Sequence, residues 1–228
     1  SGFNTLQGGS NVDTFNLNAN VTGTVNGGAG DDRFNLLEGV TIGTLDGGTG
    51  AETNGDTLAA VDDTPLTPSA NTWTIGVTNS VNQGGTAQAF QGMEIAQGDA
   101  SADTFNLSGN IVANGGAGND TFNLTSGAGT INGETDGGGA GDTVTAAGNF
   151  AVAAGTGTGT VGGRTFTTME TVSGTGVADT LTGPNAATTW NVANAPNAGT
   201  LTGGAVIAFN GMENLTGGGN ADTFNLNA

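Results

Sequence analysis

The sequence predicts an all-β solenoid, a parallel β-helix or β-roll that extends over residues 1–228 as a single unit. Three observations predict this fold: one strand pattern recurs along the chain, its copies are regularly spaced, and glycine-rich turns precede them. Repeats of this size cannot bury their apolar face alone, so neighbouring repeats must stack to form a core.

The recurring strand begins at an aspartate and alternates apolar with polar residues. Its clearest copies read Asp-Thr-Phe-Asn-Leu, as at Asp120 to Leu124. In eight copies the residue two positions after the aspartate is apolar: Phe15, Phe34, Leu58, Phe105, Phe122, Val144, Leu181 and Phe224. This alternation predicts a strand with one buried face. The preceding glycines can adopt positive φ and so favour a sharp turn.

The spacing of the aspartates indicates the coil length. Successive aspartates are 19 (13 to 32), 24 (32 to 56), 47 (56 to 103), 17 (103 to 120), 22 (120 to 142), 37 (142 to 179) and 43 (179 to 222) residues apart. When each long gap is counted as two coils, ten coils span 209 residues, at about 21 residues per coil. The sequence thus predicts ten to eleven coils.

The long gaps carry a second repeat, which runs from an aromatic residue through paired glycines to Met-Glu. We interpret these segments as coils without the aspartate turn; the alternative is that they project as β-hairpins. The recurring Trp and Met side chains are expected to fill the core. The glutamates Glu94, Glu170 and Glu213 are expected at outward positions, with their charges solvated. The alternative is that they extend an acidic stripe.

The two ends of the sequence align with each other without gaps. Residues 2–17 match residues 211–226, an advance of 209 residues. This match predicts that the chain is slightly more than one superrepeat of a tandem array.

The composition excludes several classes of function. Twenty acidic residues face only two basic ones, Arg33 and Arg164, and a net charge of −18 disfavours binding to nucleic acid or anionic membranes. The sequence has no apolar run long enough to predict membrane insertion. Histidine, cysteine, tyrosine and lysine are absent, which removes zinc sites and histidine-based catalysis. We therefore expect no enzymatic activity.

Two complete copies of the turn follow the pattern Gly-Gly-x-Gly-x-Asp-x-apolar-x, at residues 27–35 and 115–123. They resemble the repeats-in-toxin nonapeptide, and this resemblance implies Ca²⁺ bound by turn carbonyls and aspartates of stacked coils. The aspartates implicated are Asp13, Asp32, Asp103, Asp120, Asp142 and Asp222. The alternative is that each carboxylate accepts hydrogen bonds from backbone N–H groups of its own turn. In either case Asp103, Asp120 and Asp142 are expected in one column, and Asp13, Asp32 and Asp56 in another.

Over its whole length the chain resembles the β-strand repeat regions of giant bacterial surface and secreted proteins, such as adhesins of the filamentous-haemagglutinin kind. The resemblance rests on the alternation of the Trp, Phe-x-x-Met-Glu and Asp-Thr-Phe segments. It implies an extracellular or cell-surface rod, stalk or fibre. The expected partners are neighbouring repeats or other copies end to end, and cell-surface or matrix carbohydrate. A calcium-dependent folding or secretion module of a secreted enzyme or toxin is the alternative.

Overall fold

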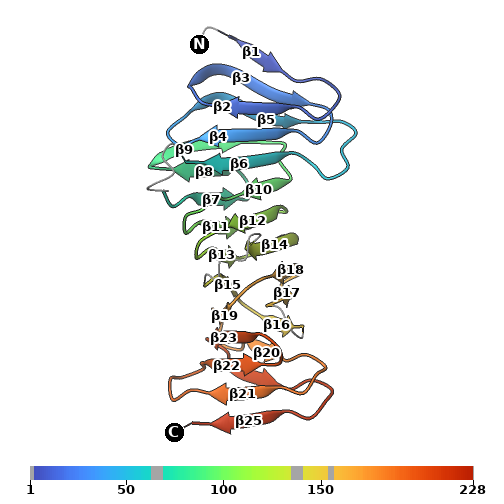
Figure 1. The fold of residues 1–228 in the computed structure, drawn as a ribbon, viewed down its shortest axis with the longest axis vertical. Helices are drawn as coiled ribbons and strands as arrows, with labels where there is room; N and C mark the ends of the chain where they lie inside the picture. Colours follow the sequence, from blue (N-terminus) through green and yellow to red (C-terminus); the bar gives the residue numbers. More distant parts are fainter. Residues whose placement is uncertain (1–2, 63–68, 135–140, 154–156, 228) are drawn as a thin grey trace.

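In the computed structural model, the described residues are 3–62, 69–134, 141–153 and 157–227. They form short β-strands and no helix, and most neighbouring strands pair in parallel, which confirms the predicted all-β solenoid. Figure 1 shows the strands stacked along one axis, with the two chain ends at opposite ends of the stack. None of the described residues belongs to a helix of the length and hydropathy needed to cross a membrane.

The strands line two opposite faces of the stack. Face 1 is one sheet with the order β2 (Thr14–Leu17), β4 (Arg33–Leu37), β6 (Thr57–Val61), β10 (Ile95–Gln97), β12 (Val112–Gly116), β14 (Gly129–Glu134), β18 (Arg164–Thr167), β17 (Gly159–Val161), β16 (Asn149–Val152), β20 (Thr180–Thr182) and β24 (Asn214–Thr216).

Face 2 consists of two sheets in line. The first has the order β1 (Thr5–Gln7), β3 (Val21–Gly28) and β5 (Ile42–Gly48). The second has the order β9 (Thr86–Phe90), β8 (Asn79–Gln83), β7 (Thr72–Ile75), β11 (Thr104–Leu107), β13 (Thr121–Leu124), β15 (Thr143–Ala146), β19 (Thr171–Gly174), β23 (Val206–Asn210), β22 (Gly199–Thr202), β21 (Thr189–Val192) and β25 (Thr223–Leu226). The two sheets join where Asp46, in β5, forms a parallel bridge with Gln91, just after β9.

The long gaps in the sequence do not form separate coils, and in this the interpretation from sequence was wrong. Each contains a three-stranded antiparallel meander that lies within a face: β7–β8–β9 and β21–β22–β23 in face 2, and β16–β17–β18 in face 1. The strands continue the sheet, so they are not projecting hairpins either. Two prolines at positions 65 and 68 predict a surface loop over residues 62–69, and this segment lies largely outside the described residues.

Paired glycines account for the meanders. Between β8 and β9 the chain reverses at Gly84 and Gly85, whose φ angles are 54° and 86°, and between β17 and β18 at Gly162 and Gly163, at 58° and 85°. Two-residue hairpin turns of this type require positive φ at both positions, which glycine adopts without steric cost.

Each meander moves the aspartate strands to the opposite face. Outside the meanders the chain alternates strictly between the faces, and a meander occupies the place of one strand. Each long gap therefore spans one and a half coils, so the chain has fewer coils than the ten to eleven expected. Asp13, Asp32 and Asp56 precede strands of face 1, whereas Asp103 and Asp120 precede strands of face 2. The matching ends of the sequence consequently lie on opposite faces, β2 in face 1 and β25 in face 2.

The core lies between the faces, and large side chains of one face oppose small ones of the other. Trp73, Phe105 and Phe122 stack along face 2 with centroid distances of 5.6 and 4.9 Å. At this level, strands β10 and β12 of face 1 carry the small residues Ala96 and Ala113 at their inward positions. The three methionines and both tryptophans are buried, as the sequence predicted.

Candidate functional site: carboxyl columns at the turns

The aspartates form columns in which each side chain binds the backbone of the preceding coil. In column one, Oδ1 of Asp32 accepts the Asp13 N–H at 2.8 Å, and Oδ1 of Asp56 accepts the Asp32 N–H at 2.7 Å. The column ends at Glu94, whose Oε2 accepts the Asp56 N–H at 2.9 Å. The expected grouping of Asp13, Asp32 and Asp56 is thus confirmed.

Column two repeats this arrangement at the edge of face 2. Oδ1 of Asp103 accepts the Asn71 N–H at 2.7 Å, Oδ1 of Asp120 accepts the Asp103 N–H at 2.8 Å, and Oδ1 of Asp142 accepts the Asp120 N–H at 2.7 Å. Glu170 ends the column by accepting the Asp142 N–H at 2.8 Å. The expected grouping of Asp103, Asp120 and Asp142 is therefore also confirmed.

The remaining aspartates begin shorter columns. In column three, Oδ1 of Asp179 accepts the Gly148 N–H at 2.5 Å, and Glu213 ends the column by accepting the Asp179 N–H at 2.8 Å. Asp222 accepts hydrogen bonds from the backbone N–H and the hydroxyl group of Thr188. The structure thus separates Asp222 from the other five predicted site residues.

The three glutamates end the columns, whereas only solvated charges at outward positions were expected of them. Their side chains are exposed, as expected, yet each accepts the N–H of the last aspartate in its column. The signal was present in the sequence, because an inward apolar residue follows each glutamate by two positions, as at Ala96 and Val172. Each long gap thus contains a further copy of the recurring strand, with glutamate in place of aspartate.

The first glycine of each turn makes room for the carboxylate. A Cβ added at Gly115 would lie 2.0 Å from Oδ2 of Asp120, and one added at Gly27 would lie 2.3 Å from Oδ2 of Asp32. Non-bonded atoms do not approach so closely. Neither of these two glycines has a positive φ, so close contacts explain the glycine and backbone conformation does not. At Gly27 the Gly47 carbonyl oxygen, 2.2 Å from the added Cβ, is a second obstacle beside the carboxylate.

The second carboxylate oxygens fall into two groups. Oδ2 of Asp13 accepts the Gly9 N–H, Oδ2 of Asp103 accepts the Asp99 N–H and Oδ2 of Asp179 accepts the Gly176 N–H, at 2.6 to 3.0 Å. These bonds match the turn-capping alternative. In contrast, the Oδ2 atoms of Asp32, Asp56 and Asp120 are buried and have no hydrogen-bond donor among the described residues. Asp32 and Asp120 belong to the two complete copies of the nonapeptide pattern, whereas Asp56 belongs to a degenerate copy.

Burial opposes ionisation of the columns. Desolvation, together with the charges of neighbouring carboxylates, raises the pKa of Asp103 to about 6 and that of Asp120 to about 7. Hydrogen bonds from backbone N–H groups act in the opposite direction. Column two therefore holds two carboxyl groups, those of Asp103 and Asp120, whose pKa values are raised towards neutral pH.

No protein-family model matches the chain, and no curated protein matches it.

The columns fit calcium in one respect only. The buried Oδ2 atoms of Asp32 and Asp120 are oxygen ligands without donors, which a cation could use. The Oδ1 atoms, however, already accept N–H groups. Calcium binding at the predicted aspartates therefore stays a prediction, and the observed contacts give these residues a structural task.

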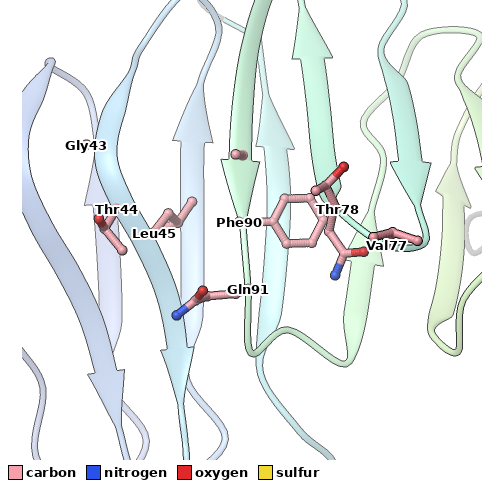
Figure 2. Close-up of a pocket in the computed structure, with 9 residues that line it drawn as sticks. Gly43, Thr44, Leu45, Val77, Thr78, Phe90 and Gln91 are labelled. Carbon is pink, nitrogen blue, oxygen red and sulfur yellow. The ribbon is translucent and has the colours of Figure 1, made fainter.

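A groove of about 320 Å³ opens where β5 and β9 part (Figure 2). Leu45 and Phe90 are buried beside it, while Thr44, Thr78 and Gln91 add polar groups to its lining. Beyond the groove, the side-chain amide of Gln88 in β9 bonds the backbone of Ile42 in β5, where backbone pairing is absent. Its Oε1 accepts the Ile42 N–H at 2.6 Å, and its Nε2 donates to the Ile42 carbonyl at 3.1 Å.

Proposed function

We propose that this chain is a structural repeat segment of a large extracellular bacterial protein, where it forms a rigid rod, stalk or fibre for adhesion or for cell-surface or matrix architecture. The observation that carries the proposal is the continuity of the stack: strands pair from coil to coil on both faces, and the carboxyl columns join the turns. At roughly 4.8 Å per strand, faces of this size span about 50 to 60 Å.

Rigidity follows from the number of links between coils. Strand ladders join the coils along both faces, stacked aromatic rings fill the interior, and carboxylates join the turns. In a solenoid each repeat contacts only its neighbours, so additional repeats extend the stack without changing its cross-section. Such a body suits extension, with adhesion performed by other domains or along its surface.

The placement of the two basic residues supports a non-catalytic role. The guanidinium of Arg33 donates to Asn35 on the outer surface, and that of Arg164 is buried against the carbonyls of Gly109, Ile111 and Ser126. Within the described residues, neither lies in an ion pair with a carboxylate that could serve as an acid or base. Without histidine, cysteine, tyrosine or lysine, the chain has few groups for proton transfer or nucleophilic attack.

The proposed partners are further repeats or other copies of the chain in line with the stack. Phe224, in β25, stacks on Trp190 with a centroid distance of 5.3 Å and leaves 44% of its surface exposed. A further coil would bury this ring and pair with the free edge of β25. Carbohydrate of the cell surface or matrix stays a predicted partner, and the groove offers it the polar groups of Thr44, Thr78 and Gln91.

A calcium-dependent folding or secretion module is the second candidate. It is favoured by the donor-free Oδ2 atoms of Asp32 and Asp120, which lie in the two complete nonapeptide turns. In this case Ca²⁺ would be required for the fold, and the rod would collapse in a chelator.

Electron microscopy and small-angle X-ray scattering of proteins with one, two and three tandem copies test the proposal. A rod predicts that the maximum dimension rises in proportion to copy number at constant cross-section. Separate globules joined by flexible linkers would contradict it. The same measurement in EDTA and in millimolar calcium separates the two candidates, because only the calcium module loses its length in EDTA.

A further inference from the structure

Three carboxylates from different segments meet at the end of column one. Glu52 lies in the turn between β5 and β6, Asp56 directly precedes β6, and Glu94 directly precedes β10. One carboxylate oxygen from each lies within 4.8 Å of the others. This acidic triad, Glu52, Asp56 and Glu94, includes two residues from the β5–β6 turn and one that follows the first meander.

The Asp56 carboxyl is the buried member of the triad. Only 1% of the residue is exposed. Its Oδ1 accepts the Asp32 N–H, while its Oδ2 is buried and has no donor among the described residues. In column three the corresponding oxygen, Oδ2 of Asp179, accepts the Gly176 N–H of its own turn. Column one therefore ends at a buried oxygen that still requires a partner.

The charge of the triad is not balanced by the protein. The chain has two basic side chains, and their hydrogen bonds place Arg33 against Asn35 and Arg164 against carbonyl groups. Desolvation, together with the charges of Glu52, Asp32 and Glu94, raises the pKa of Asp56 to about 6. The pKa of Glu52 is also raised, by desolvation and then by the charges of Glu94, Asp31 and Asp32. A cation would reverse each of these repulsions.

We propose that Glu52, Asp56 and Glu94 bind one divalent cation of the calcium class. A set of carboxylate oxygens with no nitrogen or sulfur ligand suits the hard cations Ca²⁺, Mg²⁺ and Mn²⁺. The oxygens available are Oδ2 of Asp56, the carboxylate of Glu52, and the Glu94 oxygen that does not accept the Asp56 N–H. The cation would fasten the segment after the first meander to the turn before it. The inference does not depend on the rod function.

Column three provides a matched control. Glu213 accepts the Asp179 N–H as Glu94 accepts the Asp56 N–H. No comparable acidic group surrounds Glu213 among the described residues. Glu213→Gln therefore removes a column-ending charge without removing a ligand of the triad, whereas Glu52→Gln removes a ligand without touching the hydrogen bonds of the column.

Isothermal titration calorimetry with CaCl₂ at pH 7.5, after treatment with EDTA, tests the proposal. The protein is expected to bind one more Ca²⁺ than the Glu52→Gln variant does, and Glu213→Gln is expected to bind as many as the parent protein. Because the comparison is between variants, calcium bound elsewhere along the columns does not obscure it. Equal stoichiometry and affinity in Glu52→Gln and the parent protein would overturn the proposal, as would a parent protein that binds no calcium.

A second variant guards against a folding defect. Glu94→Gln keeps an oxygen for the Asp56 N–H, and it is expected to lose the same binding event while it retains the strand signal in circular dichroism. A Glu94→Gln protein that folds and binds Ca²⁺ like the parent would also overturn the proposal. Titration with MgCl₂ identifies the ion: tighter binding of Ca²⁺ is expected, because the triad leaves room for carbonyl or water ligands.

Discussion

The backbone N–H of Asp103 donates a hydrogen bond of 2.8 Å to Oδ1 of Asp120, which lies 17 residues later in the sequence and one coil further along the stack. A side chain thus takes over, at the turns, the task that strand pairing performs on the faces. Because buried N–H groups require acceptors, the column lets the turns stack closely without unsatisfied backbone groups.

The glycine beneath each carboxylate should be irreplaceable. Gly115→Ala places a methyl group where Oδ2 of Asp120 lies, and we expect it to lower the free energy of unfolding by about 1–3 kcal/mol. The control is Gly141→Ala, where an added Cβ meets no atom closer than 3.8 Å and φ is not positive. Urea denaturation measures both. Equal losses in the two variants would contradict this role for Gly115.

The columns should make the protein more stable in mild acid than in mild base. The pKa values of Asp56 and Asp103 are raised to about 6, and that of Asp120 to about 7, chiefly by desolvation. The folded state therefore binds more protons than the unfolded state between the ordinary aspartate pKa and these values. Stability is gained as the pH falls from 8 to 5 and lost as it rises, at about 1.4 kcal/mol per pKa unit.

Urea unfolding at pH 5, 6, 7 and 8, at fixed ionic strength and in EDTA, measures this dependence. A free energy of unfolding that stays constant or rises between pH 5 and 8 would refute the inference that burial favours the protonated form of these carboxyl groups.

The aromatic stack should contribute a large share of the stability. Phe122 is fully buried and its ring lies 4.9 Å from that of Phe105, so Phe122→Ala is expected to cost about 3–5 kcal/mol. Thr143→Ala, at an outward position of the neighbouring strand, should cost less than about 1 kcal/mol. Thermal unfolding compares the variants, and similar melting temperatures would speak against a core built on this stack.

The two arginines should differ sharply when replaced by methionine. Arg164 is 1% exposed and donates to the carbonyls of Ile111 and Ser126 at 3.2 and 3.4 Å, and also to that of Gly109. Its loss removes the donor to the buried Ile111 carbonyl and to the partly buried carbonyls of Gly109 and Ser126, at about 1–3 kcal/mol. Arg33 is exposed, so Arg33→Met should change stability by less than about 0.5 kcal/mol. Chemical denaturation measures the stability of both variants. An Arg164→Met variant as stable as the parent protein would contradict this role for Arg164.

The period-two alternation after each aspartate was sufficient to predict the strands and the stack, because one buried face leaves few other folds open. The grouping of the aspartates in columns one and two followed from their spacing, whereas the glutamates that end these columns were assigned to solvated outward positions. The meanders were missed because paired glycines at residues 84–85 and 162–163 were assigned to turns of ordinary coils, although two glycines between strands also favour a tight hairpin. The triad of Glu52, Asp56 and Glu94 could not be predicted, since Glu94 reaches the others only after a meander of unknown path.

Amide hydrogen exchange at Asp103 tests the central claim, that the carboxylates hold the turns together through the backbone, most directly. In an Asp120→Ala variant the Asp103 N–H loses its acceptor, and its exchange should accelerate on the order of tenfold or more. The Asp32 N–H, bonded to Asp56 in column one, is the internal reference and should be unchanged. If both amides keep their protection, or lose it equally, the columns do not join the coils as described.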